Sequence, residues 1–188
     1  GQCLAIERAY RAPVSRDRIQ YLEAHATSTQ VGDATELEAL AESFGELHRP
    51  GQRLPIGSVK SNIGHTLEAA GGCGLLKVLL CMEHGVIPSH RRIESFNKKT
   101  PWDRIPIFVP TENSPWPLDA QGQRWGAVNS FGIGGLNAHV VVQSGSITDQ
   151  IPAPERRSWA PGLELSGDTS TASVAAASTS VSTARVAL

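Results

Sequence analysis

Three residues among the first 65 combine side chains and positions that suit carbonyl chemistry. His25 follows the apolar segment 18–24, and Lys60 and His65 follow a second apolar segment, 54–59. Short segments of this kind predict β-strands, and ligands of open α/β sheets bind beyond the strand ends. Two neutral imidazoles beside an ammonium group would stabilise negative charge that develops on a thioester oxygen. Each residue alone is more simply explained as a capping or solvated group, so the hypothesis requires that all three converge.

Residues 57–85 are expected to organise this site. We predict that the chain turns after Lys60 and then forms a long helix that carries His65 on its first turn. This helix is apolar almost all round, which predicts burial within a larger body, and its three glycines indicate closely packed backbones. The positive partial charge at the start of a helix would keep the imidazole of His65 neutral.

The remaining sequence pattern predicts an α/β layer with about five strands. Helices are expected over residues 2–11 and 34–44, strands over 18–24, 54–59, 106–110, 125–129 and 137–143, and a turn over 113–117. The loops 25–32, 60–64 and 130–136 would then meet at one edge of the sheet. Asp33 is expected to cap the second helix, and either Glu36 or Glu68 to pair with Lys60.

Composition limits the function classes. The chain has 188 residues and a net charge of -1, which gives no electrostatic footprint for nucleic acid or a membrane surface. The longest apolar run, residues 69–82, is too short to cross a bilayer. The three cysteines form no Cys-x-x-Cys pair, and the histidines lack metal-ligand spacing, so we expect no metal, no disulfide framework and a cytoplasmic location.

The chain divides near residue 143. Residues 1–143 predict one globular unit, whereas residues 144–188 are rich in alanine, serine, threonine and proline and show no amphipathic period. Such a composition is typical of a linker or a disordered tail.

Three motifs resemble the ketosynthase family of condensing enzymes, which includes the β-ketoacyl-acyl-carrier-protein synthases and the ketosynthase domains of polyketide synthases. They read Y-L-E-A-H-A-T-S-T-x-x-G-D-x-x-E (21–36), V-K-S-N-I-G-H-x-x-x-A-A-G (59–71) and N-S-F-G-I-G-G-L-N-A-H-V-V (129–141). The resemblance extends from residue 1 to about residue 142. It implies the C-terminal half of a thiolase-like α/β fold, with a roughly five-stranded mixed sheet and a buried central helix.

The resemblance also implies roles for individual residues. His25 and His65 correspond to the two active-site histidines, which donate hydrogen bonds to a malonyl thioester as decarboxylation creates an enolate. Lys60 corresponds to the lysine that orients His65, and Glu36 to the glutamate that supports the lysine and its loop. The backbone near Ile133 would contribute an oxyanion-hole N–H, with Phe131 in a gating turn. The chain itself would bind no cofactor, because phosphopantetheine is carried by a partner acyl carrier protein.

The family nucleophile has no counterpart in this sequence. The family uses a cysteine in a T-A-C-S-like context, and none of Cys3, Cys73 and Cys81 lies in such a context. We therefore expect an N-terminal ketosynthase half to supply the cysteine, within a dimeric ketosynthase assembly. Together the halves would catalyse decarboxylative Claisen condensation, an acyltransferase reaction, and the isolated chain would condense nothing.

Two alternatives belong to other classes. A non-catalytic ketosynthase-like subunit for interaction or chain-length control often lacks a histidine or the lysine, whereas His25, Lys60 and His65 are all present. A thiolase would act on acyl-coenzyme A without decarboxylation, and the K-S-N-I-G-H motif disfavours this alternative.

The basic segment 90–99 offers a first prediction. It carries Arg91 and Arg92 and could bind an acidic acyl carrier protein, or it could be an ordinary solvated loop. Reversing both charges in the completed enzyme should raise the Michaelis constant for the carrier protein. An unchanged constant would favour the solvated loop.

Overall fold

We analysed a computed structural model of the chain. The structure describes residues 1–10, 14–45, 53–91, 93, 95–96, 100–103, 105–145 and 185–187. Of the basic segment 90–99, residues 92, 94 and 97–99 therefore lie outside the described residues.

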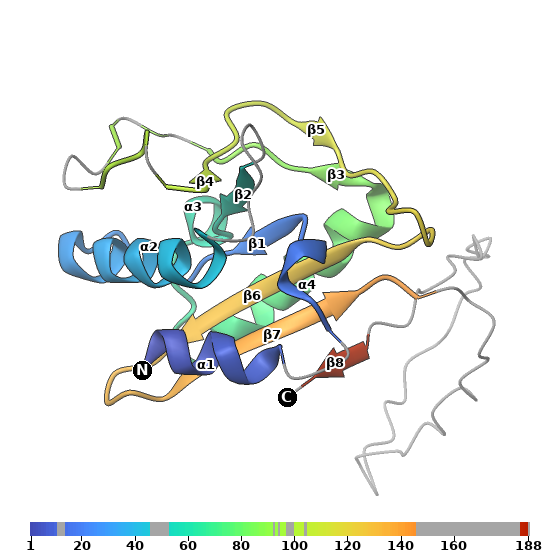
Figure 1. Cartoon of the computed structure of the whole chain (residues 1–188). Coiled ribbons are helices and arrows are strands. Elements are labelled where there is room, and N and C mark those ends of the chain that lie inside the picture. The colour runs from blue at the N-terminus through green and yellow to red at the C-terminus, as the bar shows by residue number, and fades with distance from the viewer. Residues whose placement is uncertain are drawn as a thin grey trace, which may run out of the picture.

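A six-stranded mixed sheet lies at the centre of the fold (Figure 1), and its spatial order is β4-β2-β1-β6-β7-β8. The strands are β1 Tyr21–Glu23, β2 Leu54–Gly57, β4 Ile107–Phe108, β6 Trp125–Phe131, β7 Asn137–Gln143 and β8 Arg185–Ala187. β4, β2, β1 and β6 run parallel to one another, whereas β7 is antiparallel to both of its neighbours, β6 and β8. All five expected strands are present, and the mixed α/β architecture is confirmed.

The sixth strand, β8, comes from the segment that was expected to be a linker or tail. It pairs with β7, with Val186 opposite Val142. Residues 146–184 lie outside the described part of the chain, so for them the linker assignment stays a prediction. A separate antiparallel pair joins β3 Val86–Ile87 to β5 Ser114–Pro115, which corrects the expected turn over 113–117.

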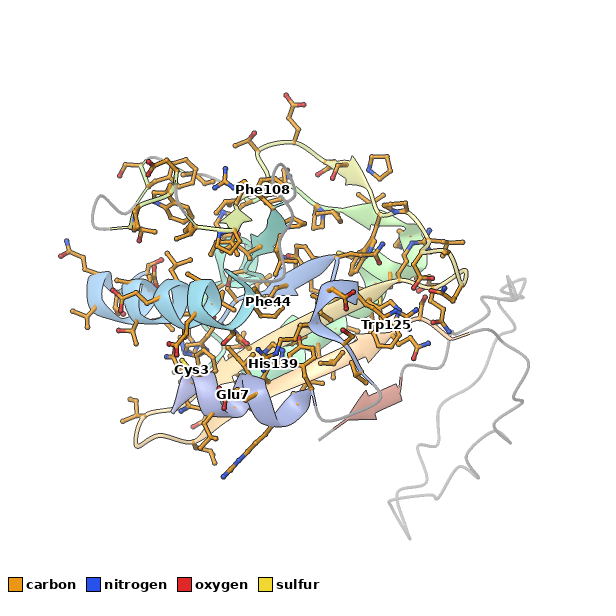
Figure 2. The ribbon with its side chains drawn as sticks, viewed as in Figure 1. Cys3, Glu7, Phe44, Phe108, Trp125 and His139 are labelled. Atoms are coloured by element: carbon orange, nitrogen blue, oxygen red, sulfur yellow. The ribbon has the colours of Figure 1, made fainter. Side chains whose placement is uncertain are left out.

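Helices cover both faces of the sheet (Figure 1). α1 Gln2–Ala9 and α2 Gln30–Phe44 pack on one face, where Leu40 and Phe44 (Figure 2) join Leu22 in one apolar core. α4 Ala70–His84 packs on the other face, where Val78 joins Tyr21 in a second core. Successive strand residues point to opposite faces, so Tyr21 and Leu22 enter different cores.

The predicted long helix is interrupted around His65, and the prediction that His65 lies on its first turn is wrong. The segment instead forms α3 Lys60–Ile63, a 3-10 turn η3 Leu67–Ala69 and then α4. Gly64 (φ 77°) and Leu67 (φ 51°) adopt left-handed backbone conformations, which a continuous right-handed helix cannot contain. His65 therefore lies outside the first turn of α4, between α3 and η3.

The start of α2 also differs from the prediction. The helix begins at Gln30 with Thr29 as its N-cap, and Asp33 lies in the first turn. The carboxylate of Asp33 still complements the positive end of the helix, but it is not the cap.

α4 is buried on one face only. Ala70, Gly74, Val78 and Met82 face the sheet, and the four-residue spacing is that of one helix face. A Cβ atom on Gly74 would lie 3.1 Å from Cγ of Glu23, which confirms the expected close approach of backbone and sheet at this position. The outer face exposes Leu76 (58%) and Leu80 (45%), so the predicted burial requires a further layer of protein. None of the helices formed by the described residues is long and apolar enough to span a membrane.

We predict that this outer face makes the isolated chain self-associate. Replacing both Leu76 and Leu80 with Glu should shift light-scattering profiles toward the monomer, because apolar area is removed from the contact. Leu118→Glu is the control, since Leu118 is similarly exposed (52%) but lies in the loop after β5. A concentration-independent monomer in the unmodified chain would contradict the prediction.

Candidate active site

The site forms where three parallel strands end. β1 pairs in parallel with β2 and β6, so that Glu23 lies opposite both Gly57 and Val128. His25 follows β1, Lys60 begins α3 after β2, and Phe131 ends β6. The parallel register therefore brings these three residues to one edge of the sheet.

The two predicted active-site histidines lie together. The ring centroids of His25 and His65 are 5.8 Å apart, and the rings meet edge to face at 87°. The ring of Phe131 also packs against His25, with a centroid distance of 5.8 Å and an interplanar angle of 54°. The expected convergence of the two imidazoles is confirmed, while the chemical roles assigned to them stay predictions.

The tautomer of His65 follows from its backbone contact. Its Nδ1 accepts a hydrogen bond of 3.0 Å from the backbone N–H of Leu67. A nitrogen that accepts carries no proton, so the proton of the neutral ring lies on Nε2. His65 therefore offers one N–H donor from a solvent-exposed ring.

His25 is held neutral by its surroundings. Burial, followed by the positive charge of Lys60 and the neighbouring His65, lowers the pKa of His25 to about 4. Its Nδ1 atom is buried and has no hydrogen-bond partner within the described part of the chain. The position of the ring therefore depends on its backbone and on its packing against the other two rings.

Lys60 is half-buried and makes no ion pair with any described residue. Burial lowers the pKa of Lys60, and the negative charges of Glu23, Glu36 and Asp33 partly oppose this shift. The predicted ion pairs with Glu36 or Glu68 are absent, and no hydrogen bond joins Lys60 to His65 in the described structure. The positive charge of Lys60 is nevertheless near enough to lower the pKa of His25.

Glu36 accepts hydrogen bonds from the backbone of the loop that carries His25. Its buried carboxylate (3% exposed) accepts hydrogen bonds from the backbone N–H groups of His25 and Ala26, each at 2.8 Å. The amide of Asn129 donates a third, also at 2.8 Å. Burial raises the pKa of Glu36, and these three donors oppose the increase. Because backbone donors occupy the carboxylate, it is not available to Lys60.

A second buried carboxylate, which the sequence analysis missed, holds the start of α3. Glu23 is 1% exposed and accepts hydrogen bonds from the backbone N–H of Val59, from Tyr21 Oη at 3.0 Å and from Lys77 Nζ at 2.7 Å. Val59 immediately precedes Lys60. The sequence signal that could have revealed this contact was a pair of opposite charges, Glu23 and Lys77, each within an otherwise apolar element.

A cleft of about 220 Å³ adjoins the site on the side of Lys60. Asp33, Lys60 and Ser61 contribute polar groups to its lining, and Phe96 and Trp102 contribute apolar ones. His25 and His65 do not line this cleft.

The turn between β6 and β7 projects away from the rest of the chain. Ile133 at its tip is fully exposed, and Leu136 is 83% exposed. Gly134 and Gly135 have positive φ angles of 90° and 86°, which glycine adopts at no steric cost. The predicted oxyanion role of the backbone near Ile133 stays a prediction.

None of the three cysteines is placed as a nucleophile at a strand-to-helix turn. Cys3 lies on α1, and Cys73 and Cys81 lie on α4. Burial raises the pKa of Cys3 and of Cys81, which opposes formation of a reactive thiolate.

We predict that His25 stays neutral down to about pH 4, which NMR titration of its imidazole can measure. The unfolded chain would bind this proton near the ordinary pKa of 6.5, so stability should fall as pH falls from 6.5 toward 4. Lys60→Met should raise the pKa of His25, because one positive charge is removed. Arg8→Gln, which removes an exposed cation on α1, should leave it unchanged. Titration of His25 near 6.5 in the unmodified protein would refute the prediction.

Comparison with protein families agrees with this geometry. The family described as "Beta-ketoacyl synthase, C-terminal domain" matches residues 1–94, and the "Ketoacyl-synthetase C-terminal extension" matches residues 97–186. The second match continues into the segment that was expected to be a tail.

Relatives of this chain include very large proteins. It is 43% identical over 147 residues to a phenolphthiocerol/phthiocerol polyketide synthase of Mycobacterium tuberculosis, a match that covers 78% of this chain and 9% of the relative. It is 39% identical over 168 residues to an erythronolide synthase of Saccharopolyspora erythraea, covering 89% of this chain and 5% of the relative. The chain therefore spans less than a tenth of these curated relatives.

Solved structures show the same fold. The ketosynthase from module 6 of the bacillaene synthase of Bacillus subtilis matches with a TM-score of 0.63 and 42% identity, over 68% of this chain and 23% of that one. An oxazolomycin ketosynthase domain of Streptomyces albus matches with a TM-score of 0.71 and 38% identity, over 81% of this chain and 27% of that one. The chain thus belongs to the β-ketoacyl synthase family, as a C-terminal portion of a thiolase-like ketosynthase domain of the polyketide synthase type.

Proposed function

We propose that this chain supplies the enolate-stabilising half of a ketosynthase that catalyses decarboxylative Claisen condensation. The observation that carries the proposal is the pair of imidazole rings of His25 and His65, 5.8 Å apart at the ends of parallel strands. Neutral imidazoles that donate N–H groups suit an oxygen atom that gains negative charge, and donors that are already in position avoid a reorganisation cost.

The reaction needs two substrates and a second protein half. An acyl group would form a thioester with the cysteine of an N-terminal half, and a malonyl-type extender would arrive on the phosphopantetheine arm of an acyl carrier protein. Loss of carbon dioxide leaves the electron pair of the broken bond as an enolate, whose oxygen accepts N–H donors from His25 and His65. The enolate carbon then attacks the acyl carbonyl, a carbon–carbon bond forms, and the cysteine thiolate leaves.

The other predicted site residues would support this step. Lys60 contributes positive potential near the enolate and disfavours protonation of His25, as the lowered pKa of that imidazole indicates. Glu36 holds the loop that carries His25 through two backbone hydrogen bonds. Phe131 packs against His25, and we assign to the neighbouring turn at Ile133 the oxyanion contact with the acyl thioester.

The family relationship supports the reaction class. The relatives named above are polyketide synthases, and the solved structures named above are ketosynthases. The alternative of a non-catalytic ketosynthase-like subunit gains no support from the site, since both histidines and Lys60 are present and the two imidazoles lie together.

The test is reconstitution of the complete enzyme. This chain is mixed with an N-terminal half that carries the cysteine, and β-ketoacyl product is measured with a malonyl carrier protein. His65→Ala should lower the turnover number by about 10²–10³-fold, the usual cost of one oxyanion donor. His84→Ala is the matched control, because this exposed histidine ends α4, far along the chain from the site.

Two results would overturn the proposal. One is a His65→Ala assembly that forms product at the unmodified rate. The other is an unmodified assembly that is folded and complete but releases no ketoacyl product, which would favour the non-catalytic alternative.

A further inference from the structure

A chain of buried hydrogen bonds leads away from the active site, and none of the roles described so far uses it. Starting from Glu36, it passes through Asn129 on β6 and His139 on β7 to Tyr10 at the end of α1. We propose that Asn129, His139 and Tyr10 are positioning residues of the condensation reaction, which fix Glu36 and thereby the loop that carries His25. This inference rests on the function proposed above.

The three hydrogen bonds of this series are short, and the two that involve Asn129 are buried. Asn129 Nδ2 lies 2.8 Å from Glu36 Oε1, His139 Nδ1 lies 2.6 Å from Asn129 Oδ1, and Tyr10 Oη lies 2.8 Å from His139 Nε2. Asn129 and His139 are 3% and 6% exposed. They are directly opposite one another in the β6–β7 pairing, so the sheet register itself sets their contact.

The donor and the acceptor of each hydrogen bond between Glu36 and Tyr10 can be assigned. Glu36 receives three N–H donors and therefore acts as an ionised acceptor, so Asn129 presents its NH₂ group to Glu36 and its oxygen to His139. His139 must then donate from Nδ1, which leaves Nε2 to accept from the hydroxyl of Tyr10. Burial lowers the pKa of His139 to about 3, in agreement with a ring that carries one proton.

With these assignments, Glu36 is the final acceptor of the hydrogen-bond series. Each group donates toward the next, from Tyr10 through His139 and Asn129 to the carboxylate. In a buried environment such donors strengthen one another, and an incomplete set would leave a buried polar atom unpaired. The carboxylate is thus held in one orientation, because Asn129 donates to Oε1, the oxygen that also accepts the N–H of His25.

The loop needs this support because its backbone is strained. Ala26 and Ser28 have φ angles of 32° and 62°, which residues other than glycine rarely adopt. Glu36 accepts the N–H groups of His25 and Ala26 at the start of this strained segment. Nδ1 of His25 has no hydrogen-bond partner among the described residues that would correct a shift of the backbone. A displaced Glu36 would therefore displace the imidazole.

His139 (Figure 2) lies on β7, where α1 packs against this strand, and its hydrogen bonds among the described residues are with Asn129 and Tyr10. Its own ring contact is with Tyr10, at a centroid distance of 5.3 Å. Any effect of His139 on turnover must therefore pass through Asn129 and Glu36.

The test compares two variants of His139 in the reconstituted ketosynthase. His139→Phe keeps a ring but removes both nitrogens, and it should lower kcat about tenfold or more with KM for the malonyl carrier protein unchanged, because a small misplacement of a reacting group is costly. His139→Gln should restore most of kcat, since an amide can donate to Asn129 and accept from Tyr10. Gln20→Leu is the control: it removes three hydrogen bonds, from the side chain of Trp116 and the backbone N–H of Trp125 and to the carbonyl of Pro117, but at the opposite end of β1. It should leave kcat unchanged.

Amide hydrogen exchange of His25 and Ala26 provides a readout that does not depend on activity. Exchange at these two N–H groups should accelerate in His139→Phe and stay unchanged in Gln20→Leu. If His139→Phe does not fold, Tyr10→Phe, which removes a single hydroxyl, should show the same two effects at smaller size. Folded His139→Phe and Tyr10→Phe variants with normal kcat and normal exchange would overturn the inference. If the unmodified assembly forms no product while exchange still responds, the proposed function fails and the hydrogen-bond chain stands.

Discussion

The site depends on the hydrogen bonds that the buried carboxylate of Glu36 accepts. This carboxylate comes from α2, yet its partners are the backbone of the His25 loop and a side chain of β6, so one group joins helix, loop and sheet. A buried charge is stable only when its hydrogen bonds are satisfied, and three N–H donors satisfy this one. If the Glu36 carboxylate were removed, the His25 loop would lose the two backbone hydrogen bonds that offset the strain of its residues with positive φ angles, Ala26 and Ser28.

The same arrangement recurs at the neighbouring strand. Glu23, buried within β1, accepts the backbone N–H of Val59 just before Lys60, and Lys77 of α4 neutralises its charge. Each segment that carries a predicted site residue therefore follows a parallel strand and is bound by a buried carboxylate. The strand register brings the segments together, and the carboxylates fix their direction. This explains how short loops can present two imidazoles at a defined distance.

The sequence allowed much of the fold to be predicted, because apolar segments such as 125–129 and 137–143 alternate clearly with polar turns. The interruption of the helix between Gly64 and Leu67 was not predictable, because a leucine side chain gives no sign that its backbone will adopt a left-handed conformation. Convergence of His25 and His65 was predicted from strand ends and motif order. The partner of Glu36 was predicted wrongly, because a charge on Lys60 is visible in a sequence whereas backbone N–H groups are not. Asn129 and His139 were treated as ordinary strand residues, since only the β6–β7 register places them opposite one another.

The central claim is that His25 and His65 together stabilise one enolate oxygen. It is tested most directly by carbon dioxide release from a malonyl thioester in the assembled enzyme, measured for both single alanine variants and for the double variant. The account predicts that each single variant loses about 10²–10³-fold, and that the double variant loses less than the product of the two, because donors to one atom act as a unit. Undiminished carbon dioxide release from either single variant, or fully multiplicative losses in the double variant, would contradict it.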